Sequence, residues 1–163
     1  MSNTGYLKQS EYEERVLQIK RVSKKTNGGN SIKFTALVVV GNKKGTVGYG
    51  MGKAVDVPSA IQKGIKAAKA NTININLAGS TIPHEINAKY NSAKVMLKPA
   101  PVGSGIIAGG VVRHVVELAG ITDISSKMHG SNNKVCNVIC SLDALSKLKP
   151  IVVVEQKGSN ESK

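Results

Sequence analysis

The first half of the chain alternates between apolar and polar residues in a pattern typical of β-strands. Strands are expected at residues 16–22, 32–40 and 46–50. In the second of these, alternate apolar side chains share one face: Ile32, Phe34, Ala36, Val38 and Val40. Glycine-containing turns at residues 23–30 and 41–45 separate the strands. The pattern therefore predicts an antiparallel three-stranded meander.

A helix is expected next, from Asp56 to Ala70. Asp56 lies near its start, and Pro58 falls in the first turn, where a missing N–H does no harm. One face of the helix is an apolar stripe of Val57, Ile61, Ile65 and Ala68, and the arc beside it carries lysines: Lys63, Lys66 and Lys69. The first unit is thus β-β-β-α, with the helix stripe packed on the sheet and the lysines turned outward.

The second half predicts a further unit of strands and helices, with a domain boundary at residue 71. Strands are expected at residues 73–77, 85–90, 93–98 and 122–127. A glycine-rich turn leads into a helix from Ile106 to Ala119, and Asn132 or Asn133 caps a last helix. The expected organisation is a flexible N-terminus at 1–13, domains at 14–71 and 72–149, and a tail at 150–163.

The charge balance points to a polyanionic partner. Lysine and arginine total 23 against 10 acids, a formal charge of +13, and phosphate backbones are the commonest polyanions in a cell. Asp56 is the only acid among the twelve basic residues that run from Arg15 to Lys69, whereas a merely solvated surface mixes both signs. An anionic membrane would require large apolar anchors, and the chain has no Trp and one Phe.

The cysteines and histidines do not suggest a metal or catalytic centre. Cys136 and Cys140 have no further Cys or His at zinc-ligand spacing and are interpreted as small core residues in a reducing compartment. The three histidines are scattered, and the acids are too few for paired-carboxylate chemistry. No segment resembles a signal peptide or a transmembrane span, so a soluble intracellular protein is expected. We therefore expect no enzyme, no metal and no cofactor.

Two glycine-rich segments resemble nucleotide-binding motifs. Residues 103–108 fit G-x-G-x-x-[GA], but too little chain follows them for a dinucleotide-binding sheet. We favour an anion site at a helix start, where Gly103, Ser104 and Gly105 contact a phosphate or a partner. Residues 48–53 do not complete a Walker motif, and they predict a strand-to-helix bend where the backbone approaches something closely, RNA included.

The aromatic content of 3% narrows the mode of RNA binding. Readers of single strands stack bases on exposed aromatic side chains, which are scarce in this chain. Lysine-rich contact with the backbone of structured RNA, recognised by shape, is the mode that remains.

Longer motifs resemble the small-subunit ribosomal protein five family across residues 14–149. In the first half they are RVSK at 21–24 followed by GG at 28–29, FTALVVVG at 34–41 and VGYGMGKA at 47–54. In the second half they are PA at 99–100, GSGIIAGG at 103–110 and GSN at 130–132. Several ordered motifs of this length are highly specific.

The resemblance implies an α+β protein with an N-terminal β-β-β-α domain like the double-stranded-RNA-binding fold. It implies a C-terminal β-α-β-α domain of the architecture shared with galactokinase-type kinases and the RNase P protein. The implied function is that of a structural constituent of the small ribosomal subunit, which binds rRNA at the head–body junction near the channel through which mRNA enters. Support of decoding accuracy and contact with ribosomal proteins four and eight are also implied.

The resemblance also implies RNA contacts, carried over by motif to Arg21, Lys24, Lys25, Gly28, Gly29 and Lys53. Lys33 is added because Asn30 stands where the family usually has a base, and Lys63 and Lys66 are added from the helical wheel alone. The turn at 23–30 is expected to reach rRNA of the head. The expected location is a ribosome of the bacterial cytoplasm, or of an organellar stroma or matrix.

Two alternatives remain open. A free-standing double-stranded-RNA-binding regulator would sediment apart from ribosomes. A kinase of the galactokinase-like class would bind ATP at residues 103–109, although it lacks the larger substrate-binding body of such enzymes.

Overall fold

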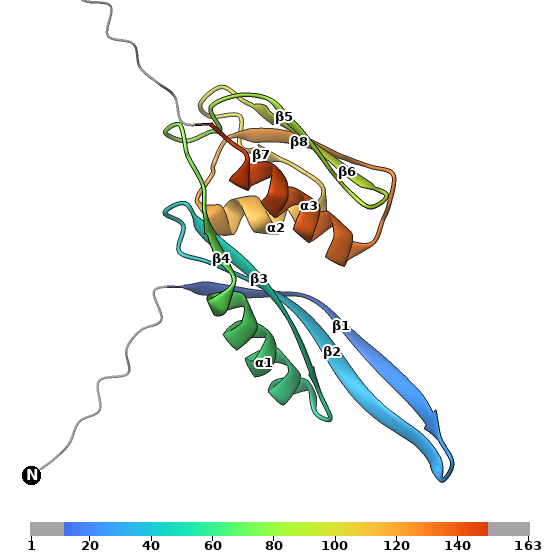
Figure 1. The fold of residues 1–163 in the computed structure, drawn as a ribbon. Coiled ribbons are helices and arrows are strands. Elements are labelled where there is room, and N and C mark those ends of the chain that lie inside the picture. Colours follow the sequence, from blue (N-terminus) through green and yellow to red (C-terminus); the bar gives the residue numbers. More distant parts are fainter. Residues whose placement is uncertain (1–11, 150–163) are drawn as a thin grey trace, which may run out of the picture.

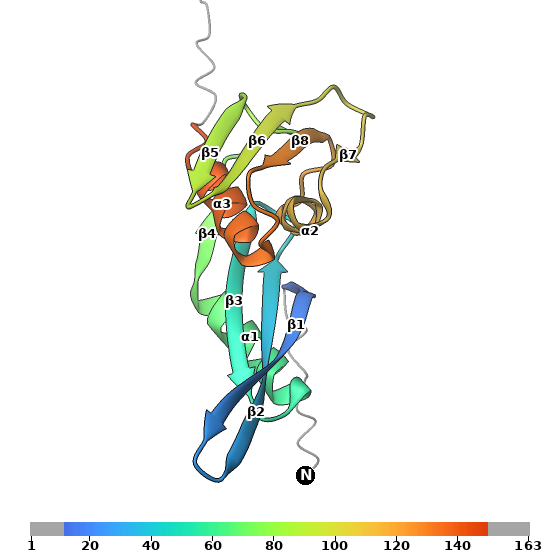
Figure 2. The same cartoon turned by 90° about the vertical axis from the view of Figure 1, so that its right-hand side faces the viewer.

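The computed structural model describes residues 12–149, which form two four-stranded sheets with helices packed against them (Figures 1 and 2). The strand orders are β1-β2-β3-β4 and β5-β6-β8-β7. The α+β fold class expected from the sequence is confirmed. The expected tail at 150–163 and residues 1–11 of the expected flexible N-terminus lie outside the described residues.

The first sheet is antiparallel throughout and consists of β1 (Glu13–Thr26), β2 (Gly29–Gly41), β3 (Thr46–Ala54) and β4 (Thr72–Asn74). The three expected strands of the meander are present but longer than predicted. The turn predicted at residues 23–30 is wrong in extent, because β1 and β2 pair through most of it and only Asn27 and Gly28 separate them. Residues exposed on both faces of a strand show no apolar alternation, so the sequence pattern could not reveal this part of the hairpin.

Helix α1 (Val57–Ala70) occupies the predicted range, with Asp56 as an extended N-cap residue and a proline in its first turn. Its buried residues are all small: Ala60, Gly64 and Ala68. Ile61 and Ile65 of the predicted stripe are half-buried and flank this small-residue face. The helix therefore lies closer to the sheet than a stripe of large side chains would allow.

Three glycines of β3 complete this close approach. A Cβ atom on Gly48, Gly50 or Gly52 would overlap main-chain atoms of α1, so the main chains of strand and helix pack directly on each other. The bend predicted for residues 48–53 is therefore wrong. The segment is strand throughout, and its backbone approaches α1.

The second domain consists of β5 (Ile86–Tyr90), β6 (Ala93–Pro99), β7 (Ile106–Ile107), α2 (Gly110–Ala119), β8 (Ile124–His129) and α3 (Lys134–Ser146). The predicted start of a helix at Ile106 is wrong, because Ile106 pairs in parallel with Ile124 of β8. The predicted cap of the last helix is confirmed, since Asn133 Oδ1 accepts from Val135 N at 3.1 Å.

The core has two parts. Residues of the first sheet and α1 form the smaller cluster. The larger cluster joins the second sheet, α2 and α3 to the other face of the first sheet through Leu37, Val39 and Val47. Cys140 belongs to this cluster and is fully buried, Cys136 is half-buried, and both are free thiols. Burial raises the pKa of the Cys140 thiol, as expected of a core cysteine.

No helix in the described part of the chain is long and apolar enough to span a membrane. Within residues 12–149, no group of three or more His, Cys, Asp or Glu side chains is arranged to hold a metal ion.

Candidate nucleic-acid interface

The outer half of the β1–β2 hairpin is a two-stranded ribbon that extends beyond the rest of the first sheet (Figure 1). β2 pairs with β3 only from Phe34 onward, whereas its pairing with β1 continues outward to Gly29. Every residue from Ser23 to Lys33 is exposed. The ribbon therefore offers side chains to solvent on both of its faces.

Strand register divides the predicted RNA-binding residues between these faces. Ala36 and Val38 of β2 pack with α1. Because side chains alternate along a strand, Arg21 (opposite Phe34) and Lys25 (opposite Asn30) lie on the α1 side. The other face carries four lysines from three strands, and we call these residues the hairpin face: Lys20, Lys24, Lys33 and Lys53.

Three lysines of the hairpin face line one hollow of about 120 Å³, together with Ser31. Ammonium and hydroxyl groups are thus gathered in one concave place, and both kinds of group donate hydrogen bonds to phosphate oxygens. A neighbouring hollow of about 210 Å³ runs from Lys20 and Met51 to Asn133 and Val135 at the start of α3. The basic surface therefore continues along the first sheet toward the second domain.

The ribbon cations have no acidic partners within residues 12–149. The ion pairs of the described chain involve other cations, among them Arg15, Lys43 and Lys69. None of these ion pairs involves Lys20 or any cation predicted to bind RNA, whether on the first sheet or on α1. The predicted cations are Arg21, Lys24, Lys25, Lys33, Lys53, Lys63 and Lys66. Their positive charge remains available to an external polyanion.

Two predicted glycines form the tip of the ribbon. Thr26 Oγ1 donates to the carbonyl of Gly29 at 2.9 Å and closes the turn. A Cβ on Gly28 would meet nothing within 4 Å. No contact inside the described chain therefore requires a glycine at Gly28, and its role in RNA contact stays a prediction.

Lys63 and Lys66 are exposed on α1, on the side of the first sheet opposite the hairpin face. The structure does not bring them together with Lys24, Lys33 and Lys53. The third lysine of the predicted arc, Lys69, is paired with Glu14 at 2.7 Å. The two α1 lysines thus form a separate surface on the same side as Arg21.

The second glycine loop is closed by an internal anion. Asp123 Oδ1 accepts from Gly103 N at 2.9 Å and from Gly105 N at 3.0 Å, while Ser104 N donates to Pro101 O. The hydrogen bond from Gly105, helped by those from its neighbours, lowers the pKa of Asp123. A phosphate could use these N–H groups only by displacing Asp123, and α2 begins five residues after Gly105. Contact of this loop with a partner stays a prediction.

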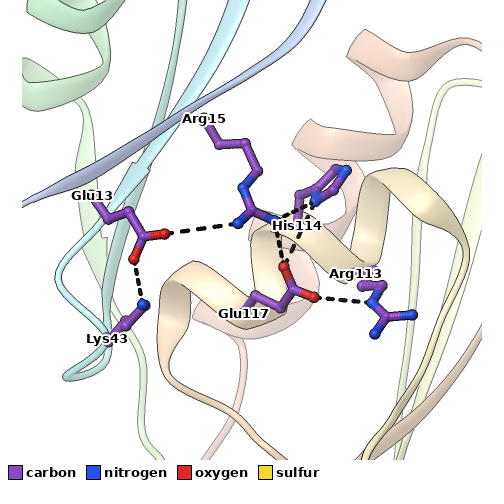
Figure 3. Close-up of polar contacts among 6 residues, drawn as sticks. All are labelled: Glu13, Arg15, Lys43, Arg113, His114 and Glu117. Atoms are coloured by element: carbon purple, nitrogen blue, oxygen red, sulfur yellow. Dashed lines mark hydrogen bonds and ion pairs between the residues drawn. The ribbon is translucent and has the colours of Figure 1, made fainter.

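A network of ion pairs joins β1 to α2 (Figure 3). Arg15 Nη1 donates to Glu117 Oε2 at 2.6 Å and to His114 Nδ1 at 2.9 Å. Arg113 Nε donates to Glu117 Oε1 at 2.9 Å, and this hydrogen bond, together with Arg15, lowers the pKa of Glu117. Glu13 pairs with both Arg15 and Lys43. Two carboxylates offset most of the charge of the three cations Arg15, Lys43 and Arg113, so this network serves mainly as a link between the domains.

The sequence interpretation missed some cations of potential function. Lys20 was counted as basic but was not assigned to the site, although it faces outward with Lys53 across Thr35. It also overlooked Lys89, Lys94 and Lys127, which are exposed on the second sheet. The two-residue spacing of polar positions in β5 and β6 was the signal that could have revealed Lys89 and Lys94 as residues of one sheet face.

Comparison with protein-family models gives two matches in chain order. Residues 12–76 match the model described as Ribosomal protein S5, N-terminal domain. Residues 88–157 match the model described as Ribosomal protein S5, C-terminal domain.

Proposed function

We propose that this chain, which belongs to the ribosomal protein S5 family, binds rRNA with both faces of the β1–β2 ribbon. Members of this family are structural, rRNA-binding constituents of the small ribosomal subunit and are not enzymes. The hairpin face supplies Lys24, Lys33 and Lys53, and the opposite face supplies Arg21 and Lys25. A protruding ribbon with cations on both sides suits insertion between segments of folded RNA.

The observation that carries this proposal is that the ribbon cations have no acidic partner within residues 12–149, whereas Arg15, Lys43 and Lys69 of the same half of the chain are paired. Folding does not require cations at exposed ribbon positions, because they neither fill the core nor form ion pairs. Binding of an RNA backbone, which releases condensed counterions, does make use of them. Gly28 and Gly29 at the tip allow the RNA backbone to approach closely.

We further propose the placement that the family resemblance implies. The ribbon tip lies toward rRNA of the head at the head–body junction, near the channel through which mRNA enters. The second domain contacts ribosomal proteins four and eight, and the protein supports decoding accuracy. The proposal applies equally to a bacterial ribosome in the cytoplasm and to an organellar ribosome in the stroma or matrix.

The test compares the two faces of the ribbon at equal charge change. One variant carries Lys24→Gln and Lys33→Gln, and a second carries Arg21→Gln and Lys25→Gln. A control carries Lys44→Gln and Lys149→Gln, two exposed lysines outside the ribbon. Affinity for purified small-subunit rRNA is measured over a range of salt concentrations. The logarithm of the binding constant falls as the logarithm of the salt concentration rises. In each ribbon variant this fall is expected to become less steep, by about 0.7 to 0.9 for each phosphate that the protein no longer neutralises.

Both ribbon variants should also incorporate less well into reconstituted small subunits, and subunits that contain them should misread more codons. A salt slope equal to that of the control for both ribbon variants would overturn the proposed RNA contact. Normal misreading despite a lowered slope would overturn only the proposed role in decoding.

A further inference from the structure

The outer face of the second sheet carries a second set of unpaired cations. α2 and α3 cover the inner face, where Ala88, Val95 and Leu97 are buried. The alternate positions therefore point outward. The strand register arranges them in adjacent rows, which we call the open sheet face: Asn87–Met96–Lys127, Lys89–Lys94–His129 and Lys98–Ser125.

This face is exposed and strongly basic. All of its lysines, Asn87 and His129 are exposed, and Met96 and Ser125 are half-buried. Lys98 pairs with Glu85 at 3.5 Å. Within residues 12–149, no ion pair involves Lys89, Lys94 or Lys127. The described chain thus leaves three lysines of one sheet face without counter-charge.

The register places like charges directly opposite each other. Lys89 of β5 lies directly opposite Lys94 of β6, and Lys94 lies directly opposite His129 of β8 on its other side. Lysines at directly opposed positions repel and destabilise a sheet. On the ribbon, by contrast, the cross-strand partners of the cations are uncharged, such as Ser31 for Lys24. The arrangement on the open sheet face is unfavourable for the isolated protein and becomes favourable when an anion lies between the lysines.

The same residues line a hollow of about 310 Å³, with Asn87, Lys89, Lys94, Met96 and His129 among its walls. The amide of Asn87 adds hydrogen-bond donors to those of the lysines. The rows of this face contain no Phe, Tyr or Trp, and the imidazole of His129 is their one aromatic ring, so lysines that contact phosphates outnumber groups that could stack on bases. The chemistry of the face therefore fits an RNA backbone.

We propose that the open sheet face is a second surface for the phosphate backbone of rRNA, separate from the ribbon. This inference rests on the proposed function and extends it to the second domain. The ribbon tip and the second sheet lie at opposite ends of the molecule (Figure 1). A protein that holds RNA at both ends bridges two segments of RNA, and its two ends are connected by the shared core and by the ion pairs between β1 and α2.

The test neutralises the face and measures the salt dependence of binding. The full chain with Lys89→Gln, Lys94→Gln and Lys127→Gln is titrated with purified small-subunit rRNA. The matched control carries Lys44→Gln, Lys147→Gln and Lys149→Gln and therefore has the same net charge. The salt slope is expected to fall by about 2 to 3 in the face variant relative to the control. Thermal unfolding should show the face variant to be at least as stable as the wild type, because a repulsive row has been removed.

The outcomes separate this inference from the proposed function. If the wild type fails to bind rRNA, the proposed function fails as well. If the ribbon variants lower the slope while the open-face variant matches its control, only the second surface is overturned. If the open-face variant keeps its slope but incorporates poorly into subunits, the face binds an acidic protein, and the RNA assignment is again overturned.

Discussion

At its two ends, β1 places the same kinds of side chain in different surroundings. Arg15, at the end next to α2, contacts Glu117, Glu13 and His114 (Figure 3). Lys24 and Lys25, at the outer end, have no ion pair within residues 12–149. The residue type does not decide whether a cation supports the fold or remains available for RNA. The acids brought near it by distant parts of the chain do.

This difference changes how the basic composition is interpreted. The sequence shows one nearly continuous run of positive charge from Arg15 to Lys69. In the folded chain, Arg15, Lys43 and Lys69 are paired with acids, so the unpaired charge of this run lies mainly on the ribbon and on part of α1. Exposed ion pairs contribute little stability individually. The Arg15–Glu117 pair joins β1 to α2, whereas Lys69–Glu14 joins α1 to β1.

The largest expected effect is a loss of stability when the close packing of β3 on α1 is disturbed. Gly52→Ala places a methyl group against the main chain of α1, and we expect a decrease in unfolding free energy on the order of 3 kcal/mol. Gly28→Ala at the ribbon tip is the matched control, because its Cβ meets nothing within 4 Å. Urea unfolding of the full chain measures both. Equal stability of the two variants would contradict the close packing of β3 on α1.

A smaller effect follows from giving the outer end of β1 the acid that it lacks. Ser31 lies opposite Lys24 and lines the same hollow as Lys33. Ser31→Glu should pair with these lysines and weaken rRNA binding by roughly tenfold to a hundredfold near 0.1 M salt, as expected when the protein neutralises one or two fewer phosphates. Asn30→Glu, opposite Lys25 on the other face, is the comparison. Unchanged affinity in both variants would show that the ribbon charge does not drive binding.

The converse change removes the acidic partner of Arg15 at the inner end of β1, next to α2. Glu117→Gln removes the shared partner of Arg15 and Arg113 and should lower the unfolding free energy at pH 7 by about 1 kcal/mol. The folded-state pKa of Glu117 lies below its ordinary value of 4.5. Its contribution is therefore fully present above that pH and is lost as the pH falls through the folded-state pKa. The difference between variant and wild type should shrink in acid, and a constant difference would contradict the ion-pair origin.

The smallest effect concerns an acid whose partners are main-chain N–H groups. Asp123→Asn weakens the hydrogen bonds that hold Gly103 and Gly105. Faster amide hydrogen exchange at these two glycines is expected, with little change in the network around Arg15. Because the pKa of Asp123 is lowered in the folded state, the wild-type loop should also lose protection as the pH falls through that pKa. Protection that does not differ between variant and wild type would contradict the role of Asp123.

Strong local signals made much of the fold predictable. The range of α1 followed from Asp56, Pro58 and the helical period, and the cap of α3 followed from its asparagines. The start of α2 did not, because Ile106 is held by its pairing with Ile124, which lies eighteen residues further along the chain. The glycines of β3 were noticed, but their partner α1 could not be identified without the packing.

The site was predictable in composition and less so in arrangement. Motifs and charge pointed to the ribbon lysines, but only the register separates Lys24 from Lys25 onto opposite faces. The cations of the second sheet were missed because Lys94 and Lys127 are far apart in sequence and meet only in the assembled sheet. Which basic residues are neutralised by acids also depends on tertiary contacts, as for Arg15 and Glu117.

The link between Arg15 and Glu117 also sets an order of events during translation of this chain. The two residues are separated by 102 positions, so a nascent chain exposes the finished β1–β2 ribbon well before Glu117 leaves the exit tunnel. The first sheet and α1 are contiguous in sequence and need only short loops to close, whereas the link must wait for most of the second domain. Until then Arg15 lacks its closest carboxylate, and the emerging chain is more basic near its N-terminal end than the finished protein. Completing the second domain thus neutralises Arg15 and, in the same step, brings Lys89, Lys94 and Lys127 together on the open sheet face, so the basic surface moves from the inner end of β1 to the second sheet as the chain is finished.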